Sequence, residues 1–475
     1  MGRGAPRAGL LRHPLDGPPS LGDLAAAMEA RDPGADLVWL DSGAAAETGR
    51  SLLATGSRIV LEPGLPVLPQ LRAALASMPA LAPGDVVPLG LVGWFGYELA
   101  DETMGMPVPR APAHHRASWL AVDRGLLVDH ENGTAELVAL DREGAGAWSA
   151  ELDAWRHEML ELLASARAAS RTGDGARTAG ATATAPADRP VDGAPPARRR
   201  DDDDRYAALV ERCQEAIREG EAYQLCLTTS VAVEHEADID PLALHARLRA
   251  ASPAHHGALL RIGGTALVSA SPETFLRLER DDEGLVVSTR PIKGTRPRGA
   301  DAAADAALAA ELAASDKERA ENLMIVDLMR NDLSRVCALG TVTVTGLLEI
   351  ETYAHVHQLV STIEGRLRPA LDALDAVAAC FPAGSMTGAP KRRAMQLLAE
   401  LEGAPRGVYS GCAGYLAADG TADLAMVIRS VLVEGRTATL GAGGGITALS
   451  VPVEEVAEMR LKSAALLAAL GVERA

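Results

Sequence analysis

Segments that favour strands and segments that favour helices follow one another along this chain without the regular alternation of a βαβ fold. Between residues 35 and 140 the sequence has short runs of β-forming residues that Gly and Pro interrupt, such as Arg58–Leu61 and Thr134–Leu140. From Ala147 to about Ala168 the apolar residues return at helical spacing. We therefore predict an α+β fold, in which large, mixed and mainly antiparallel sheets pack against helices.

A polar segment divides the chain. Residues 169–204 are mainly Ala, Thr, Gly, Pro, Asp and Arg, so they cannot bury enough apolar surface to form a core. The full chain has 475 residues, which is a length typical of roughly two to three domains. We predict an N-terminal region over 1–168, a disordered linker over 169–204 and a larger domain over 205–475.

The larger domain carries clear helix and strand signals. Ser315 followed by Glu318 is a capping-box pattern and predicts the start of a helix. A last helix is predicted from about Pro452 to Leu470. Before it, Arg429–Val433 and Thr437–Leu440 predict two strands, followed by a glycine turn.

The composition excludes several classes of partner. The formal net charge is −18 at pH 7, which disfavours nucleic acids and anionic membranes as main ligands. No apolar run has the length of a membrane span, and the first residues lack the apolar core of a signal peptide. We expect a cytoplasmic protein whose five scattered cysteines are reduced and buried rather than bound in disulfides or to zinc.

The segment Thr289–Gly299 places Lys293 among three arginines, two prolines and two glycines. It reads as a strand that runs into a rigid turn, which would hold the lysine at a fixed angle. Neighbouring guanidinium groups and partial burial would both lower the pKa of this lysine. A neutral amine is a nucleophile. The alternative is a solvated basic loop on an acidic protein.

Two predicted helices carry pairs of carboxylates. Glu318 and Glu321 lie three residues apart, as do Glu455 and Glu458, and Lys462 follows Glu458 at a distance of four. Each pair therefore shares one helix face. On facing helices the four carboxylates would suit Mg²⁺, which prefers oxygen ligands. The alternative is ordinary solvent-facing ion pairs.

Two glycine-containing segments could bind an anion. Gly441–Ile446 has three consecutive glycines whose N–H groups could converge on it, with a flexible connector as the alternative. Phe381–Lys391 is a loop of small residues before a predicted helix, and it could bind a carboxylate through Thr387. Its spacing does not match a P-loop, which argues against a nucleotide phosphate.

Glu273 follows Pro272 in the apolar stretch 269–276. A carboxyl group in such surroundings can keep its proton and act as a general acid. The alternative is a glutamate at a strand edge in water. His355 and His357 have no further His or Cys nearby, and we expect them to be polar lining rather than metal ligands.

Together and in this order, these motifs resemble the chorismate-utilising enzymes, the family of anthranilate synthase component I, isochorismate synthase, salicylate synthase and aminodeoxychorismate synthase component I. The matching residues are Ser271–Glu273, Pro291–Thr295, Glu321–Asp332, Gly384–Lys391, Gly443–Gly445, and Glu458 with Lys462. The resemblance implies an anthranilate synthase component I-like fold, with 205–475 as its chorismate-binding catalytic domain. Gly93–Tyr97 matches the family's N-terminal region more weakly.

The resemblance also implies how chorismate is held. Mg²⁺ on Glu321 and Glu458, with Glu318 and Glu455 nearby through water, would bind the ring carboxylate. The residues implied for substrate binding are Arg429, Tyr409, Thr387, Lys462 and the N–H groups of Gly443, Gly444 and Gly445, with Arg429, Tyr409 and the glycines at the enolpyruvyl carboxylate.

Two further residues carry the implied reaction. Glu273 would protonate the departing 4-hydroxyl group while neutral Lys293 adds at C2 of chorismate. Ammonia would then enter at C4 and expel the lysine, which gives 4-amino-4-deoxychorismate. Within the family, a lysine in Pro291–Thr295 resembles the branch that makes this product, whereas anthranilate synthases have alanine there.

Two positions depart from the family's pattern. Many members have a histidine directly before Leu359–Ser361, where this chain has Gln358. That histidine assists pyruvate elimination in the anthranilate branch, so its absence fits an enzyme that stops at aminodeoxychorismate, with altered binding as the alternative. Gln224 stands where salicylate and isochorismate synthases have a lysine that activates water, which disfavours a water-adding activity.

The chain shows no glutaminase pattern of a Gly-x-Cys-x-Gly turn with a following His/Glu pair. The resemblance therefore implies a separate glutamine amidotransferase subunit as the ammonia source, with free ammonia as the alternative. The reaction would be an amino-group transfer of the transaminase class, for p-aminobenzoate and folate synthesis. Anthranilate synthase component I and a non-catalytic, chorismate-binding regulatory subunit are the alternative functions.

Overall fold

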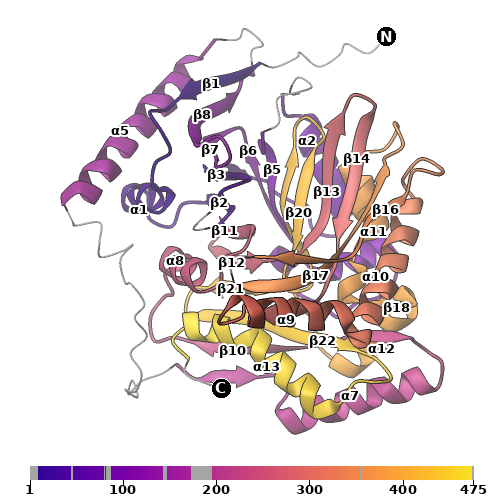
Figure 1. The fold of residues 1–475 in the computed structure, drawn as a ribbon. Coiled ribbons are helices and arrows are strands. Elements are labelled where there is room, and N and C mark those ends of the chain that lie inside the picture. The colour runs from indigo at the N-terminus through magenta and orange to yellow at the C-terminus, as the bar shows by residue number, and fades with distance from the viewer. Residues whose placement is uncertain are drawn as a thin grey trace.

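The computed structural model describes residues 9–43, 46–79, 81, 87–142, 147–172, 195–353 and 355–472. Two large sheets and the helices around them make up this part of the chain (Figure 1). Every pairing between named strands in it is antiparallel. The predicted α+β fold with mainly antiparallel sheets is confirmed.

The first sheet has 12 strands in the described residues. They are β1 (Leu10–Pro14), β2 (Leu37–Asp41), β3 (Arg50–Ala54), β7 (Arg124–Asp129), β8 (Thr134–Leu140), β9 (Ala197–Arg199), β10 (Gln224–Glu234), β11 (His256–Ile262), β12 (Thr265–Ser271), β18 (Gly388–Ala389), β21 (Ser430–Glu434) and β22 (Thr437–Ile446). Their order is β1-β8-β7-β3-β2-β11-β12-β21-β22-β10-β18, and β9 also pairs with β10. The pairing of β2 with β11 joins the N-terminal strands to the C-terminal ones.

The second sheet has 10 strands in the same part of the chain. They are β4 (Ser57–Arg58), β5 (Gly90–Phe95), β6 (Ala117–Val122), β13 (Thr274–Asp281), β14 (Gly284–Arg290), β15 (Ile292–Pro297), β16 (Thr343–Thr352), β17 (Val356–Arg366), β19 (Cys412–Ala417) and β20 (Ala422–Met426). Their order is β15-β17-β14-β13-β20-β19-β5-β6-β4, and β16 also pairs with β17. Here β5 pairs with β19, so both sheets combine strands from the predicted N-terminal region and from the larger domain.

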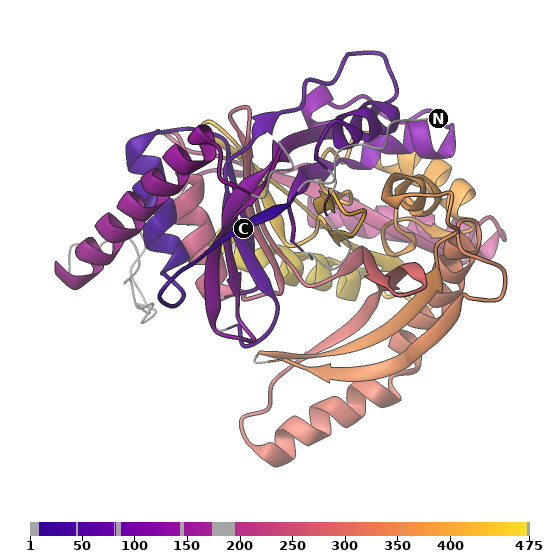
Figure 2. The same ribbon diagram turned by 90° about the horizontal axis from the view of Figure 1, so that it is seen from above.

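Helices cover both sheets. Their bounds are α1 (Leu21–Arg31), α2 (Val67–Ala76), η1 (Tyr97–Leu99), α3 (Ala100–Met104), α4 (Ala113–Arg116), α5 (Ala150–Thr172), α7 (Asp203–Arg218), α8 (Pro241–Ala251), α9 (Ala302–Ala314), α10 (Asp316–Ser334), α11 (Ala373–Cys380), η2 (Gly384–Met386), α12 (Lys391–Glu402) and α13 (Pro452–Ala469). Helices α7 and α13 lie along β10 and β22, whereas α10 and α11 pack on the second sheet (Figure 1). In Figure 2, α9 and the β16–β17 hairpin lie at one edge of the molecule.

Apolar side chains from both sheets form one layer between them. Val38 and Leu260 of the first sheet lie in the same buried cluster as Trp94 and Leu120 of the second. Burial of such large side chains is the main favourable term in folding. The N-terminal strands therefore share a core with the rest of the chain.

The ends of the predicted linker are ordered. Helix α5 continues to Thr172, and β9 pairs with β10. The Asp202 side chain accepts a hydrogen bond from the backbone N–H of Arg205 at 2.8 Å and so caps α7. The prediction of disorder is wrong for these parts, because they form helix and strand. Residues 173–194 lie outside the described residues.

No helix within the described ranges combines the length and the apolar character that a membrane crossing requires.

Candidate active site

Lys293 of β15 faces Glu321 of α10. The Lys293 Nζ and Glu321 Oε2 atoms are 3.9 Å apart, and the two side chains are only 14% and 8% exposed. The next residue, Gly294, lies close to α9 and α10, because a Cβ there would be 2.7 Å from Leu312 and 3.0 Å from the Glu318 side chain. Its φ of +86° also favours glycine.

The three arginines near Lys293 bind carboxylates of their own instead of crowding the lysine. The ion pairs are Arg290 with Glu351, Arg296 with Glu311 and Glu318, and Arg298 with Asp305. Burial lowers the pKa of Lys293, but neighbouring groups, with Glu321 foremost, outweigh it and raise the pKa overall. The predicted lowering of this pKa is wrong, because the charges that face the lysine are negative.

Carboxylates of α10 and α13 lie close to two neighbouring residues of β22. A Cβ on Gly444 would lie 3.0 Å from Glu455 Oε2 and 3.8 Å from Glu458 Oε1, and one on Gly445 would lie 3.3 Å from Glu321 Oε2. Lysines pair with the α13 carboxylates. Their ion pairs are Lys317 Nζ to Glu455 Oε1 at 3.2 Å and Lys462 Nζ to Glu458 Oε1 at 2.6 Å.

The protonation of these carboxylates follows their surroundings. Burial raises the pKa of Glu321, which Lys293 only partly offsets. Burial also opposes ionisation of Glu458, but Lys462 outweighs it and lowers the pKa of Glu458. In the described part of the chain, no three of Glu318, Glu321, Glu455 and Glu458 bring their oxygens within 4.8 Å of one another. The donors are all oxygens, which is the chemistry Mg²⁺ requires, since this ion keeps several waters and needs few protein ligands.

The predicted glycine turn at 441–446 is wrong, because β22 continues to Ile446. Gly443, Gly444 and Gly445 pair with residues of β10 as ordinary strand positions. A Cβ on Gly443 would lie 2.1 Å from the Leu227 carbonyl oxygen, and one on Gly445 would lie 2.2 Å from Gln224 Nε2. These glycines therefore allow a close approach of chain segments rather than forming a turn.

Arg429 and Tyr409 lie beside β22. A Cβ on Gly441 would lie 2.2 Å from the Tyr409 ring, so the ring packs directly on the strand. Arg429 precedes β21 with a φ of 51°. Burial lowers its pKa, and Tyr409 and Glu458 oppose this shift. The two predicted substrate-binding residues thus lie near each other and near the α13 carboxylates.

Glu273 is buried between β12 and β13. Burial raises the pKa of Glu273 to about 7, against the effects of a hydrogen bond with Ser385 and of the charges of Lys293 and Lys462. The apolar surroundings predicted for this carboxyl group are present. Ser385 is a neighbour that the sequence interpretation did not single out, although it lies in the small-residue loop.

The hydroxyl group of Thr387 is used within its own loop. It donates to the carbonyl oxygens of Ala383 at 3.2 Å and Gly384 at 3.3 Å, and the residue is fully buried. Lys391 Nζ donates to Asp332 Oδ2 at 2.5 Å. The loop is therefore held by internal contacts, and these contacts do not leave the Thr387 hydroxyl hydrogen available to an anion.

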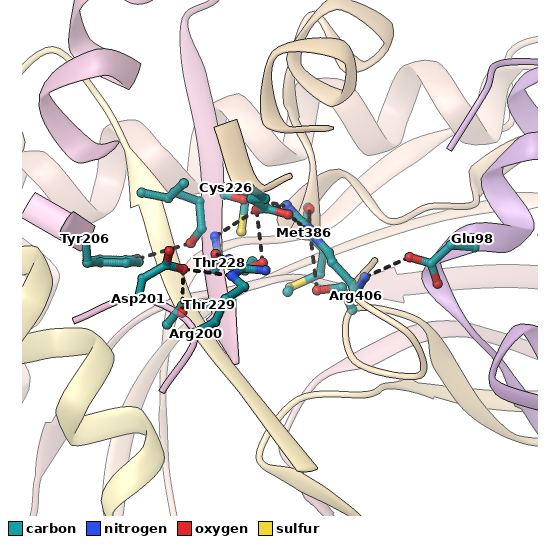
Figure 3. Close-up of polar contacts among 12 residues, drawn as sticks. Glu98, Arg200, Asp201, Tyr206, Cys226, Thr228, Thr229, Met386 and Arg406 are labelled. Carbon is teal, nitrogen blue, oxygen red and sulfur yellow. Dashed lines mark hydrogen bonds and ion pairs between the residues drawn. The ribbon is translucent and has the colours of Figure 1, made fainter. Parts of the chain in front are cut away.

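A buried arginine ties the site to the N-terminal part of the chain (Figure 3). The Arg406 guanidinium donates to Glu402 at 2.7 Å, to the Met386 carbonyl at 2.7 Å and to the Cys226 carbonyl at 2.9 Å. Its backbone N–H donates to Glu98 Oε1 of η1 at 2.8 Å. Arg406 thus joins η1, β10, η2 and α12. The sequence interpretation missed it, because a single arginine carries no motif.

We predict that Arg406→Met lowers the free energy of unfolding by about 3–5 kcal/mol, because it leaves the buried Glu402 carboxylate without its cation. Chemical denaturation measures this loss. The matched control is Arg393→Met, which removes a half-exposed pair with Glu221 and should cost about 0–1 kcal/mol. Equal losses in the two variants would contradict the role of Arg406.

Comparison with known proteins identifies relatives of this chain. Residues 39–468 match the model of the chorismate binding enzyme family. The chain is 46% identical over 386 residues to an aminodeoxychorismate synthase of Streptomyces pristinaespiralis, which covers 80% of this chain and 51% of the relative. It is 37% identical over 420 residues to anthranilate synthase component 1 of Streptomyces coelicolor, covering 87% and 79%.

A solved structure is similar along most of its length. Anthranilate synthase component I from Streptococcus pneumoniae superimposes with a TM-score of 0.71 at 26% identity, covering 89% of this chain and 93% of that one. The chain spans about half the length of the aminodeoxychorismate synthases that it matches. With nearly the whole chain matched by the family model, this protein belongs to the chorismate binding enzyme family.

Proposed function

We propose that this chain is an aminodeoxychorismate synthase subunit, which converts chorismate and ammonia to 4-amino-4-deoxychorismate. The observation that carries the proposal is Lys293, whose side chain is only 14% exposed and faces Glu321 across 3.9 Å. The charge of Glu273 also helps to raise its pKa. Relatives named aminodeoxychorismate synthase, at 46% and 45% identity, support it.

The reaction divides into two balanced displacements. The amine of Lys293 forms a bond to C2, the two ring double bonds shift, and the C4–O bond breaks while Glu273 gives its proton to the leaving hydroxyl, which departs as water. Ammonia then forms a bond to C4, the double bonds shift back, and the C2–N bond to Lys293 breaks. A covalent intermediate makes one difficult displacement into two easier ones.

The side chains around the ring supply charge and orientation. Arg429 and Tyr409 would bind the enolpyruvyl carboxylate, since an arginine pairs well with a carboxylate, and Lys462 would also contact the substrate. Glu321 and Glu458 would hold Mg²⁺, with Glu318 and Glu455 through water, and the bound ion would withdraw electrons from the ring through its carboxylate. Because the pKa of Lys293 is raised, its ammonium must lose a proton before the amine can add.

The ammonia requires a source, for which we propose a glutamine amidotransferase as partner. The exchange of a hydroxyl for an amino group would place the enzyme among the amino-group transferases. The product would serve p-aminobenzoate and folate synthesis, in the cytoplasm. The second candidate function is anthranilate synthase component I, which the relative from Streptomyces coelicolor and the structural neighbour favour.

Incubation with chorismate, Mg²⁺ and ammonium should yield 4-amino-4-deoxychorismate, which liquid chromatography with mass detection measures. Lys293→Ala should abolish the product because it removes the nucleophile. Lys293→Arg keeps the positive charge but should also be inactive. Release of anthranilate and pyruvate would favour the second candidate function, and chorismate binding without turnover would indicate a non-catalytic regulatory subunit.

The acid role of Glu273 predicts a pH dependence. Because the pKa of Glu273 is about 7 and Lys293 must react as the neutral amine, kcat/KM should rise with pH below about 7 and level off above it, where loss of the acid offsets the gain of amine. In Glu273→Gln the rise should continue through pH 7, and the rate should be lower by roughly 10²–10⁴-fold. The control is Glu279→Gln at an exposed position of β13, which should keep the profile. A wild-type profile that keeps rising through pH 7 without a bend would refute the role.

A further inference from the structure

Two neighbouring histidines of α4 meet one carboxylate of β21. The His114 Nε2 atom lies 2.7 Å from Glu434 Oε1, and the His115 Nε2 atom lies 3.1 Å from Glu434 Oε2. The two ring centroids are 4.5 Å apart. Glu434 is the last residue of β21, and Arg429 lies just before the first, so the cluster is at the other end of this strand from the chorismate-binding residues.

The surrounding fold holds the two histidines in place. The His114 carbonyl oxygen accepts hydrogen bonds from Trp94 Nε1 and from Ser118 Oγ, both at 3.0 Å. The His115 carbonyl lies against Gly96, where a Cβ would come within 2.1 Å of its oxygen. The backbone that carries both rings is therefore fixed before any ligand binds, which lowers the entropy cost of binding.

The backbone of Glu434 is also held in place by the fold. It ends β21, where it pairs with Thr265 of β12 and Thr437 of β22. Within the described residues the Glu434 carboxylate forms ion pairs with the two histidines and with no lysine or arginine. A cation bound here would bring a positive charge to this carboxylate.

The ring nitrogens that face Glu434 can act as metal ligands. In the tautomer with the proton on Nδ1, each imidazole offers Nε2 as a ligand atom.

We propose that His114, His115 and Glu434 form a binding site for a divalent transition-metal ion such as Zn²⁺. Their ligand atoms all lie within 4.8 Å of one another, and two histidines with a glutamate are a known zinc ligand set that leaves one position for water. The side chains of His114 and Glu434 are 47% and 36% exposed, which gives an ion access. Imidazole ligands distinguish this site from the all-oxygen site for Mg²⁺.

The ion would join two parts of the chain that are distant in sequence. In the sequence, helix α4 lies between β5 and β6, which belong to the second sheet, whereas β21 belongs to the first sheet. A metal that binds only the folded state stabilises that state. Zn²⁺ should therefore raise the thermal midpoint of the protein.

The test titrates chelator-treated, full-length protein with Co²⁺, whose visible absorption reports tetrahedral coordination, followed by displacement with Zn²⁺. Wild type should bind one equivalent of Zn²⁺ and gain thermal stability. His114→Gln, His115→Gln and Glu434→Gln should each weaken Zn²⁺ binding by at least about tenfold. Loss of a residue that only hydrogen-bonds to a metal ligand already lowers metal affinity by about 10–100-fold. The control is His157→Gln on the exposed face of α5, which should bind as wild type does.

Two readouts keep the outcome clear. The thermal midpoint in chelator shows whether each variant folds, and chorismate turnover with Mg²⁺ should stay at the wild-type level, because none of the three residues belongs to the chorismate site. Absence of binding at millimolar Zn²⁺ would overturn the proposal. So would binding that persists in the Glu434→Gln variant but is lost in Glu321→Gln, because the ion would then occupy the chorismate site.

Discussion

The close pairing of β22 with β10 is the constraint on which the candidate site depends. At Gly443 and Gly445 there is no room for a side chain, because Leu227 and Gln224 of β10 lie within about 2 Å of where a Cβ would be. Side chains of α10 and α13 therefore come close to the backbone of β22. This arrangement brings Glu321 of α10 and Glu455 of α13 toward the same strand from different helices.

Charge balance is the second constraint. The chain has only four lysines, and three of them, Lys293, Lys317 and Lys462, lie against the carboxylates of the candidate site. A buried carboxylate without a counter-charge is costly. The lysines therefore stabilise the carboxylates when no metal ion is bound. A cation at the same carboxylates would have to compete with these lysines. The same balance explains why the pKa of Lys293 is raised rather than lowered.

The sequence was informative where a local pattern determines structure. The Ser315 side chain caps α10 as its pattern predicted, and the order of the motifs identified the family correctly. Patterns of small residues were less informative. Three glycines predicted a turn, but in β22 they make room for side chains from other elements, which a local pattern does not report. The charges around Lys293 were misjudged for the same reason, since Arg296 and Arg298 find carboxylates on α9.

The proposed mechanism requires that Lys293 bond covalently to the substrate. Intact-protein mass spectrometry after incubation with chorismate and Mg²⁺, without ammonia, detects such a bond. We expect a mass increase of one chorismate less one water, which disappears when ammonium is added and never forms in Lys293→Ala. Full turnover with ammonium but no adduct without it would rule out the covalent mechanism.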